Sequence, residues 1–161
     1  MRILVIMRGL PGSGKSSWIR ENGLEPFTLS TDSLRLLYSA PVLNLSGQSV
    51  ISQRVNKLVF AALDKLLAIR MKNGDLTVVD ACHVREEDFL RYRDLIREYR
   101  YRALVADFSD VPLEECKSRN RLRDEMRLVP EADIDRMHSM LIKAKLPGWV
   151  QVFSHNDRIT L

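Results

Sequence analysis

The sequence has few cysteines and no long uninterrupted apolar run. Cys82 and Cys116 stand apart, without a CxxC spacing or a Cys/His cluster, which favours reduced structural thiols over zinc or a disulfide. The apolar run near the N-terminus is too short to span a bilayer, and the one from Leu58 to Ile69 is broken by charged residues. Arg2 opens a strand-like stretch rather than a signal peptide. We therefore expect a soluble cytoplasmic protein without a membrane partner.

Internal repeats and low-complexity linkers are also missing. The 161 residues, 45% of them hydrophobic, are enough to bury the core of one domain, so we expect residues 1–161 to form a single unit. The formal net charge is +4 and the isoelectric point is near 9.3. This mild positive charge suits a polyanionic substrate but does not identify one.

What the sequence does contain is a phosphate-binding pattern directly after an apolar run. Residues 9–16 fit G-x-x-x-x-G-K-[ST] in the strand-then-helix context of a P-loop. Lys15 is expected to contact the β and γ phosphates, and the Ser16 hydroxyl to hold Mg²⁺. The residues expected around the phosphates are Gly9, Pro11, Gly12, Ser13, Gly14, Lys15, Ser16 and Ser17. The pattern predicts binding of ATP, or another nucleoside triphosphate, with Mg²⁺.

Predicted strands and helices alternate along the chain. The expected strands cover residues 3–7, 27–30, 76–80, 103–108 and 149–153. The expected helices cover residues 16–21, 51–71, 89–99, 112–121 and 130–145. The long helix is predicted to bury Val55, Leu58, Val59, Ala62, Leu66 and Ile69. The alternation predicts an α/β P-loop fold of the adenylate-kinase type: a mostly parallel sheet with helices on both faces and ligands at the strands' carboxyl ends.

The segment from Ser30 to Arg35 offers a catalytic carboxylate. A kinase for an alcohol acceptor needs a base near the attacking oxygen, and Asp32 is the best candidate. Arg35, three residues further along a helix, is placed to hold an acceptor phosphate beside it. The alternative is that Asp32 caps a helix and pairs with Arg35 on the surface.

An arginine-rich segment follows the fourth strand. Arg119 and Arg123 are four residues apart and are candidates for lid arginines that contact the triphosphate, with Arg121 and Arg127 as alternatives. The competing interpretation is a solvated helix face in which acidic neighbours pair with these arginines. Asp80, at the end of a buried strand, is a candidate for orienting Mg²⁺ and equally for clamping Arg35 or Arg123.

Taken in order, these motifs resemble the kinase domain of phage and bacterial polynucleotide 5'-kinase/3'-phosphatases. The resemblance rests on the P-loop followed by Ser17-Trp18, Asp-x-x-Arg at Asp32, Val-Val-Asp ending at Asp80 and Arg-Asn-x-x-Arg at Arg119. It implies ATP-dependent phosphorylation of 5'-hydroxyl ends of DNA or RNA in nucleic-acid repair. It also implies Asp32 as general base, Arg35 on the phosphate 3' of the terminal nucleoside, and Arg123 on the donor phosphates. The phosphatase motif DxDGT is absent, which predicts a stand-alone kinase or one excised from a longer protein.

Other acceptors and other classes stay open at this stage. Pro41 and Val129 are candidates for an apolar surface under the terminal base, although each is more typical of simple packing. A small-molecule or modified-base kinase would use the same loop, base and lid. A nucleotide-hydrolysing switch is a third possibility, but it needs a water-orienting residue that is not evident here. Oligomeric state stays open.

Overall fold

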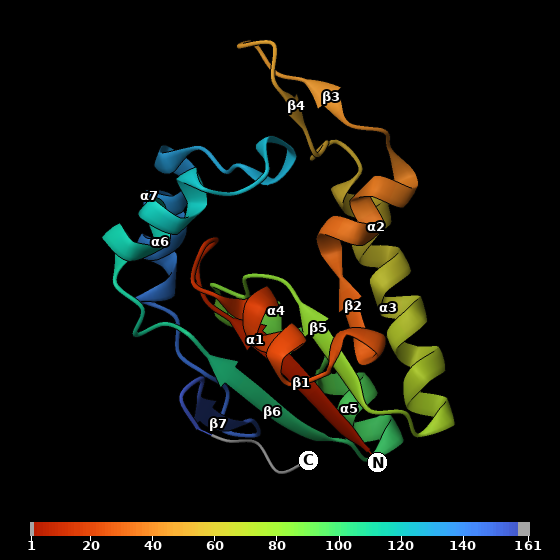
Figure 1. The fold of residues 1–161 in the computed structure, drawn as a ribbon. Coiled ribbons are helices and arrows are strands. Elements are labelled where there is room, and N and C mark those ends of the chain that lie inside the picture. Colours follow the sequence, from red (N-terminus) through yellow and green to blue (C-terminus); the bar gives the residue numbers. More distant parts are fainter. Residues whose placement is uncertain (1, 158–161) are drawn as a thin grey trace.

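The molecule is built around a parallel sheet, seen in a computed structural model that describes residues 2–157. The sheet has five strands in the order β2-β5-β1-β6-β7, and each neighbouring pair is parallel (Figure 1). The strands are β1 (Ile3–Arg8), β2 (Thr28–Ser30), β5 (Thr77–Asp80), β6 (Arg102–Asp107) and β7 (Gln151–Ser154). The predicted mostly parallel sheet is confirmed.

Helices cover both faces of this sheet. They are α1 (Lys15–Glu21), α2 (Thr31–Tyr38), α3 (Asn56–Asn73), α4 (Glu86–Leu90), α5 (Arg93–Tyr99), α6 (Leu113–Arg121) and α7 (Glu131–Leu141). Leu4 and Ile6 of β1 pack in a core with α2 to α5, whereas Val5 and Met7 pack on the other face with Trp18 of α1. Because both faces are covered, β1 is buried along its whole length and is apolar from Ile3 to Met7. Its last residue, Arg8, is buried in an ion pair with Asp107 at 2.9 Å. A third core, which includes Cys116 and Ile134, joins α6 to α7.

The long helix α3 forms as predicted, but its buried face was predicted only in part: Val59 is buried and Val55 packs against the core, as expected. The line that packs into the core is Val59, Leu63, Leu67 and Met71, whereas Leu58, Leu66 and Ile69 are exposed. Apolar residues occupy more than half of the helix circumference, so periodicity alone does not say which part meets the sheet. The helix also begins at Asn56 rather than Ile51, and Ile51 instead donates its backbone N–H to Met126 O at 3.1 Å.

Three other boundaries differ from the sequence prediction. The helix expected over residues 89–99 is two short helices, α4 and α5, separated at Arg91 and Tyr92. The Arg91 side chain contacts Asp64, 27 residues away, and the Tyr92 hydroxyl contacts His83. Phe27 lies in a 3₁₀ turn, η1 (Glu25–Phe27), before β2. At the C-terminal side, α7 ends at Leu141 and β7 begins at Gln151, while Trp149 and Val150 pack against the core.

A small antiparallel hairpin after α2 has no counterpart in the sequence prediction. Its strands are β3 (Val42–Leu43) and β4 (Ser49–Val50), each only two residues long. The hairpin approaches the 3₁₀ turn η2 (Glu125–Arg127), and the two lie together at the top of the view in Figure 1. Within residues 2–157, no helix has the length and apolar character needed to cross a membrane.

Candidate active site

The glycine-rich loop joins β1 to α1 and lies against α6. Gly14 precedes α1 with a left-handed φ of 102°, and no side chain caps the helix N-terminus. A Cβ on Gly12 would lie 2.2 Å from the carbonyl oxygen of Cys116, so only glycine allows this approach. Lys15 is buried, and its ammonium donates to the Gly9 and Leu10 carbonyls at 2.9 and 2.7 Å. The loop therefore concentrates backbone N–H groups and one cation beside α6.

Ser16 and Asp80 face each other at the carboxyl ends of the two central strands. The Ser16 hydroxyl donates to Asp80 Oδ2 at 3.1 Å. Burial raises the pKa of the Asp80 carboxyl, whereas Lys15, the Ser16 hydroxyl and Arg123 favour its charged form and Asp32 opposes it. A hydroxyl next to a buried carboxylate is a donor set that suits Mg²⁺, so these two residues fit the ion that a P-loop kinase fold implies.

Asp32 and Arg35 form an ion pair on the first turns of α2. Arg35 Nη1 lies 2.7 Å from Asp32 Oδ1, and Arg35 Nε donates to Asn56 Oδ1 at 2.9 Å. The helix cap is Ser30, whose hydroxyl accepts from the Ser33 N–H at 3.4 Å, so Asp32 is not the capping residue. The Asp32 side chain is 37% exposed and the Arg35 side chain 12% exposed. The carboxylate is thus accessible, while its arginine partner is held in place by α3.

The arginines of the lid segment have different surroundings. Arg119 donates to the Ser13 carbonyl at 3.4 Å and pairs with Glu115, which keeps it beside the P-loop. Arg123 is half-buried and contributes to the charge around Asp80, whereas Arg121 is exposed and paired with Glu131. Arg127 is exposed in η2. Of the three alternatives for the lid arginine, Arg123 is the one that acts on the charge of Asp80, and its contact with phosphate stays a proposal.

A buried asparagine holds the loop that carries these arginines. Asn120, at 1% exposure, donates to the Val129 carbonyl at 2.8 Å and accepts from the Val129 N–H at 3.2 Å. The Val129 side chain packs against the α6–α7 core, and Pro41 is exposed just before the hairpin. Contact of these two residues with an acceptor stays a proposal.

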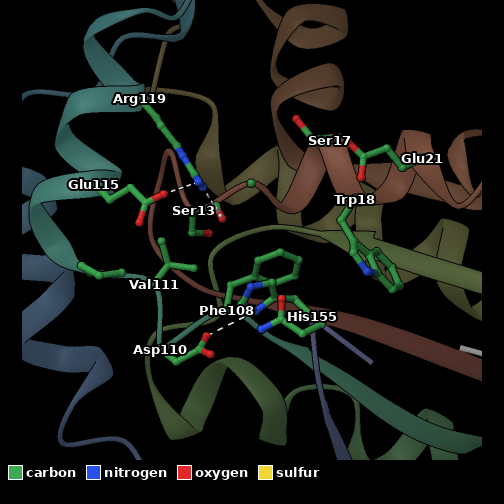
Figure 2. A pocket seen from close by; sticks show the side chains of 13 residues that line it. Ser13, Ser17, Trp18, Glu21, Phe108, Asp110, Val111, Glu115, Arg119 and His155 are labelled. Carbon is green, nitrogen blue, oxygen red and sulfur yellow. Dashed lines mark hydrogen bonds and ion pairs between the residues drawn. The ribbon is translucent and has the colours of Figure 1, made fainter. Parts of the chain in front are cut away.

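A pocket of about 610 Å³ opens beside the P-loop on the α6 side (Figure 2). Ser13, Trp18, Val111, Arg119 and His155 are among its lining residues. The His155 ring stacks on Phe108, with centroids 4.7 Å apart, and pairs with Asp110 at 3.2 Å. The lining combines the aromatic and apolar side chains of Trp18, Phe108 and Val111 with polar and charged ones, among them the acidic Glu21, Asp110 and Glu115. Sequence reasoning assigned His155 no role; the only signal was the position of Phe108 at the end of β6.

Comparisons with solved structures show the same fold in several kinases. A chain of the Pnkp1/Rnl/Hen1 RNA repair complex matches with a TM-score of 0.69 at 23% identity, over 87% of this chain and 44% of that one. A Chloroflexus aurantiacus protein provisionally described as a kinase matches with a TM-score of 0.63 at 21% identity, over 94% and 86%. A sugar kinase from Janibacter sp. HTCC2649 matches with a TM-score of 0.57 at 17% identity, over 98% and 88%.

These likenesses establish the fold and not the acceptor. The chain spans less than half the length of the RNA repair chain that it matches. A comparison with curated proteins gives no match. The family model described as an AAA domain, AAA_33, matches residues 4–143. Since that match covers most of the sequence, the chain belongs to the AAA_33 family, and its fold is that of a nucleotide-binding P-loop kinase.

Proposed function

We propose that this protein is a polynucleotide 5'-kinase that transfers the γ-phosphate of ATP to a 5'-hydroxyl end of DNA or RNA. The observation that carries the proposal is that α2, which bears the Asp32–Arg35 ion pair, lies on the other side of the P-loop from α6 (Figure 1). Residues of α6 line the pocket to which we assign the nucleoside. In this arrangement the ATP donor would bind on the α6 side of Lys15, and the hydroxyl acceptor on the α2 side. The ordered motifs of the sequence support the same acceptor, and the fold shared with a chain of an RNA repair complex is compatible with it.

In the proposed reaction each residue has one task. The 5'-oxygen attacks the γ-phosphorus, Asp32 accepts the proton that this oxygen loses, and the bond from the γ-phosphorus to the bridging oxygen breaks to release ADP. Lys15 and Arg123 stabilise the charge on the γ-phosphate oxygens. Ser16 and Asp80 would hold Mg²⁺, which when bound supplies charge neutralisation between the β and γ phosphates. Arg35 would exchange part of its contact with Asp32 for the phosphate 3' of the terminal nucleoside.

A small-molecule kinase is the second candidate, and one observation favours it. Arg35 is already bound to Asp32 and Asn56, so its guanidinium has an internal role that needs no acceptor phosphate. The fold shared with a sugar kinase over 98% of this chain and 88% of that one is compatible with this alternative.

One experiment separates the two candidates. The protein is incubated with γ-labelled ATP and Mg²⁺ in the presence of matched 5'-hydroxyl and 5'-phosphate oligonucleotides, alongside a panel of sugars and nucleosides. We expect label only on the 5'-hydroxyl oligonucleotides, and Arg35→Ala should raise their KM by ~10-fold or more, because a charged hydrogen bond to phosphate is lost. Label on a sugar or nucleoside, unaffected by Arg35→Ala, would establish the second candidate instead.

A further inference from the structure

The loop that follows Asp80 contains a buried histidine with unusual backbone geometry. His83 is 5% exposed and has a φ of 45°, one of two non-glycine residues among residues 2–157 with positive φ. Histidine tolerates the left-handed region better than β-branched residues, but the conformation still costs energy. Contacts elsewhere must therefore hold it in place.

Both ring nitrogens of His83 have a partner in the core. Nδ1 lies 2.6 Å from the Met7 carbonyl and Nε2 lies 2.9 Å from the Tyr92 hydroxyl. A carbonyl oxygen only accepts, so Nδ1 carries the hydrogen and Nε2 accepts from Tyr92. Tyr92 itself is fully buried at the break between α4 and α5. The Tyr92 hydroxyl has this histidine as its hydrogen-bond partner, and in the neutral form of His83 both ring nitrogens have a complementary partner.

These contacts tie the loop after β5 to the P-loop. The β1–β5 ladder ends at the pair Ile6 and Val79, and the Met7 carbonyl, one residue further on, receives the His83 N–H. In the same loop the Cys82 carbonyl accepts from the N–H of Gly9 at 2.9 Å. Along the chain, Asp80 lies between the last pair of the β1–β5 ladder and these two hydrogen bonds of Cys82 and His83. Its Oδ2 accepts from the Ser16 hydroxyl at 3.1 Å.

We propose that His83 and Tyr92 are positioning residues that hold the Asp80 carboxylate in register with Ser16 and the P-loop. This inference rests on the proposed function only in taking Asp80 and Ser16 as the residues that hold Mg²⁺ with the nucleotide. The side chains of His83 and Tyr92 are buried, and their hydrogen bonds run to Met7 and to each other. Their effect passes through the loop from Asp80 to His83, so it should appear in the magnesium dependence of the site rather than in acceptor binding.

The chain offers a matched control for removing the Tyr92 hydroxyl. Tyr101 is also buried, and its hydroxyl donates to the Asp75 carbonyl at 2.9 Å, at the opposite end of β5 from Asp80. Tyr92→Phe and Tyr101→Phe each delete one hydroxyl that is hydrogen-bonded within the protein and keep the ring. They should lower stability by similar amounts, so a difference between them at the site reports position and not stability.

The test measures binding of a fluorescent ATP analogue as Mg²⁺ is titrated. Tyr92→Phe should raise the Mg²⁺ concentration for half-maximal binding by ~3- to 10-fold, and Tyr101→Phe should leave it unchanged. His83→Asn, which suits the left-handed backbone and can still donate to Met7, should have a smaller effect than His83→Ala. Equal magnesium dependence in the two Phe variants would overturn the inference. If the wild type binds the analogue with Mg²⁺ but phosphorylates no oligonucleotide, the proposed acceptor is wrong. The inference about His83 and Tyr92 is then still decided by the magnesium dependence of the two Phe variants.

Discussion

At the scale of single residues, the accessible carboxylate of Asp32 is the position on which the proposed chemistry depends. Its side chain is 37% exposed and carries an ion pair to Arg35, so it is open to an incoming hydroxyl. Asp32→Asn keeps the shape but cannot accept a proton, and we expect phosphate transfer to fall by ~10²-fold or more. Single-turnover transfer and ATP binding should be measured together, because binding should persist. An unchanged rate would remove Asp32 from the mechanism.

A second prediction for a single residue concerns His83 and the pH dependence of the protein's stability, not catalysis. Burial lowers the pKa of His83 to about 4, and the positive charge of Lys15 lowers it further in the same direction. Backbone hydrogen bonds and the negative charge of Asp88 act the other way and raise the pKa. Between about pH 6.5 and pH 4, His83 therefore stays neutral in the folded protein, whereas it takes up a proton in the unfolded chain. Its stabilising contribution is present above that pH and is lost as the pH falls towards 4.

Urea unfolding of the wild type and His83→Asn between pH 7.5 and 5 measures this contribution. The wild type should be the more stable at pH 7.5, and its advantage should shrink by about 2 kcal/mol by pH 5, since each pKa unit corresponds to about 1.4 kcal/mol. Subtracting the variant removes the titration of the carboxylates that both proteins share. An advantage that stays constant with pH would show that His83 is not held neutral by the fold.

At the scale of elements, the close approach of the P-loop to α6 couples the phosphate site to the lid. Gly12→Ala would place a Cβ 2.2 Å from the Cys116 carbonyl at a φ of 79°. Left-handed strain of about 1–2 kcal/mol and overpacking of about 1–3 kcal/mol should both destabilise the protein and weaken ATP binding. Gly47→Ala is the control, because its φ is 74° and nothing lies within 4 Å of the added Cβ. Comparable losses for both variants in urea unfolding would argue that α6 moves aside freely.

The sequence predicts an element well when residues close together in the chain determine it, and poorly when contacts between distant residues do. The P-loop and the strands around Asp80 have strong local patterns, and they are where the sequence placed them. The buried face of α3 and the break before α5 are set by contacts distant in sequence, such as Arg91 with Asp64, which no local period contains. The pocket beside the P-loop includes His155 and Phe108, whose rings stack although they lie 47 residues apart in the sequence, so residue type alone gave no signal.

At the scale of the whole molecule, the acceptor question becomes one of electrostatics. The net charge of +4 is modest, so binding of a polynucleotide must come from local cations such as Arg35 and Arg123 rather than from the overall field. Each phosphate contacted by a cation releases counterions and adds about 0.7 to the slope of log affinity against log salt for a single strand. Small acceptors, with no phosphate or only one, lack most of this dependence.

Salt therefore discriminates among acceptors without any substitution. If three phosphates are contacted, the KM for a 5'-hydroxyl oligonucleotide should rise by ~10-fold or more between 50 and 200 mM salt. The KM for a nucleoside 3'-phosphate, which keeps the terminal hydroxyl and the phosphate for Arg35, should rise much less. The KM for ATP is measured in parallel, so that weaker donor binding is not mistaken for weaker acceptor binding. Equal slopes for oligonucleotide and nucleotide would mean that the protein contacts only the terminal unit, and would shift the assignment towards a small acceptor.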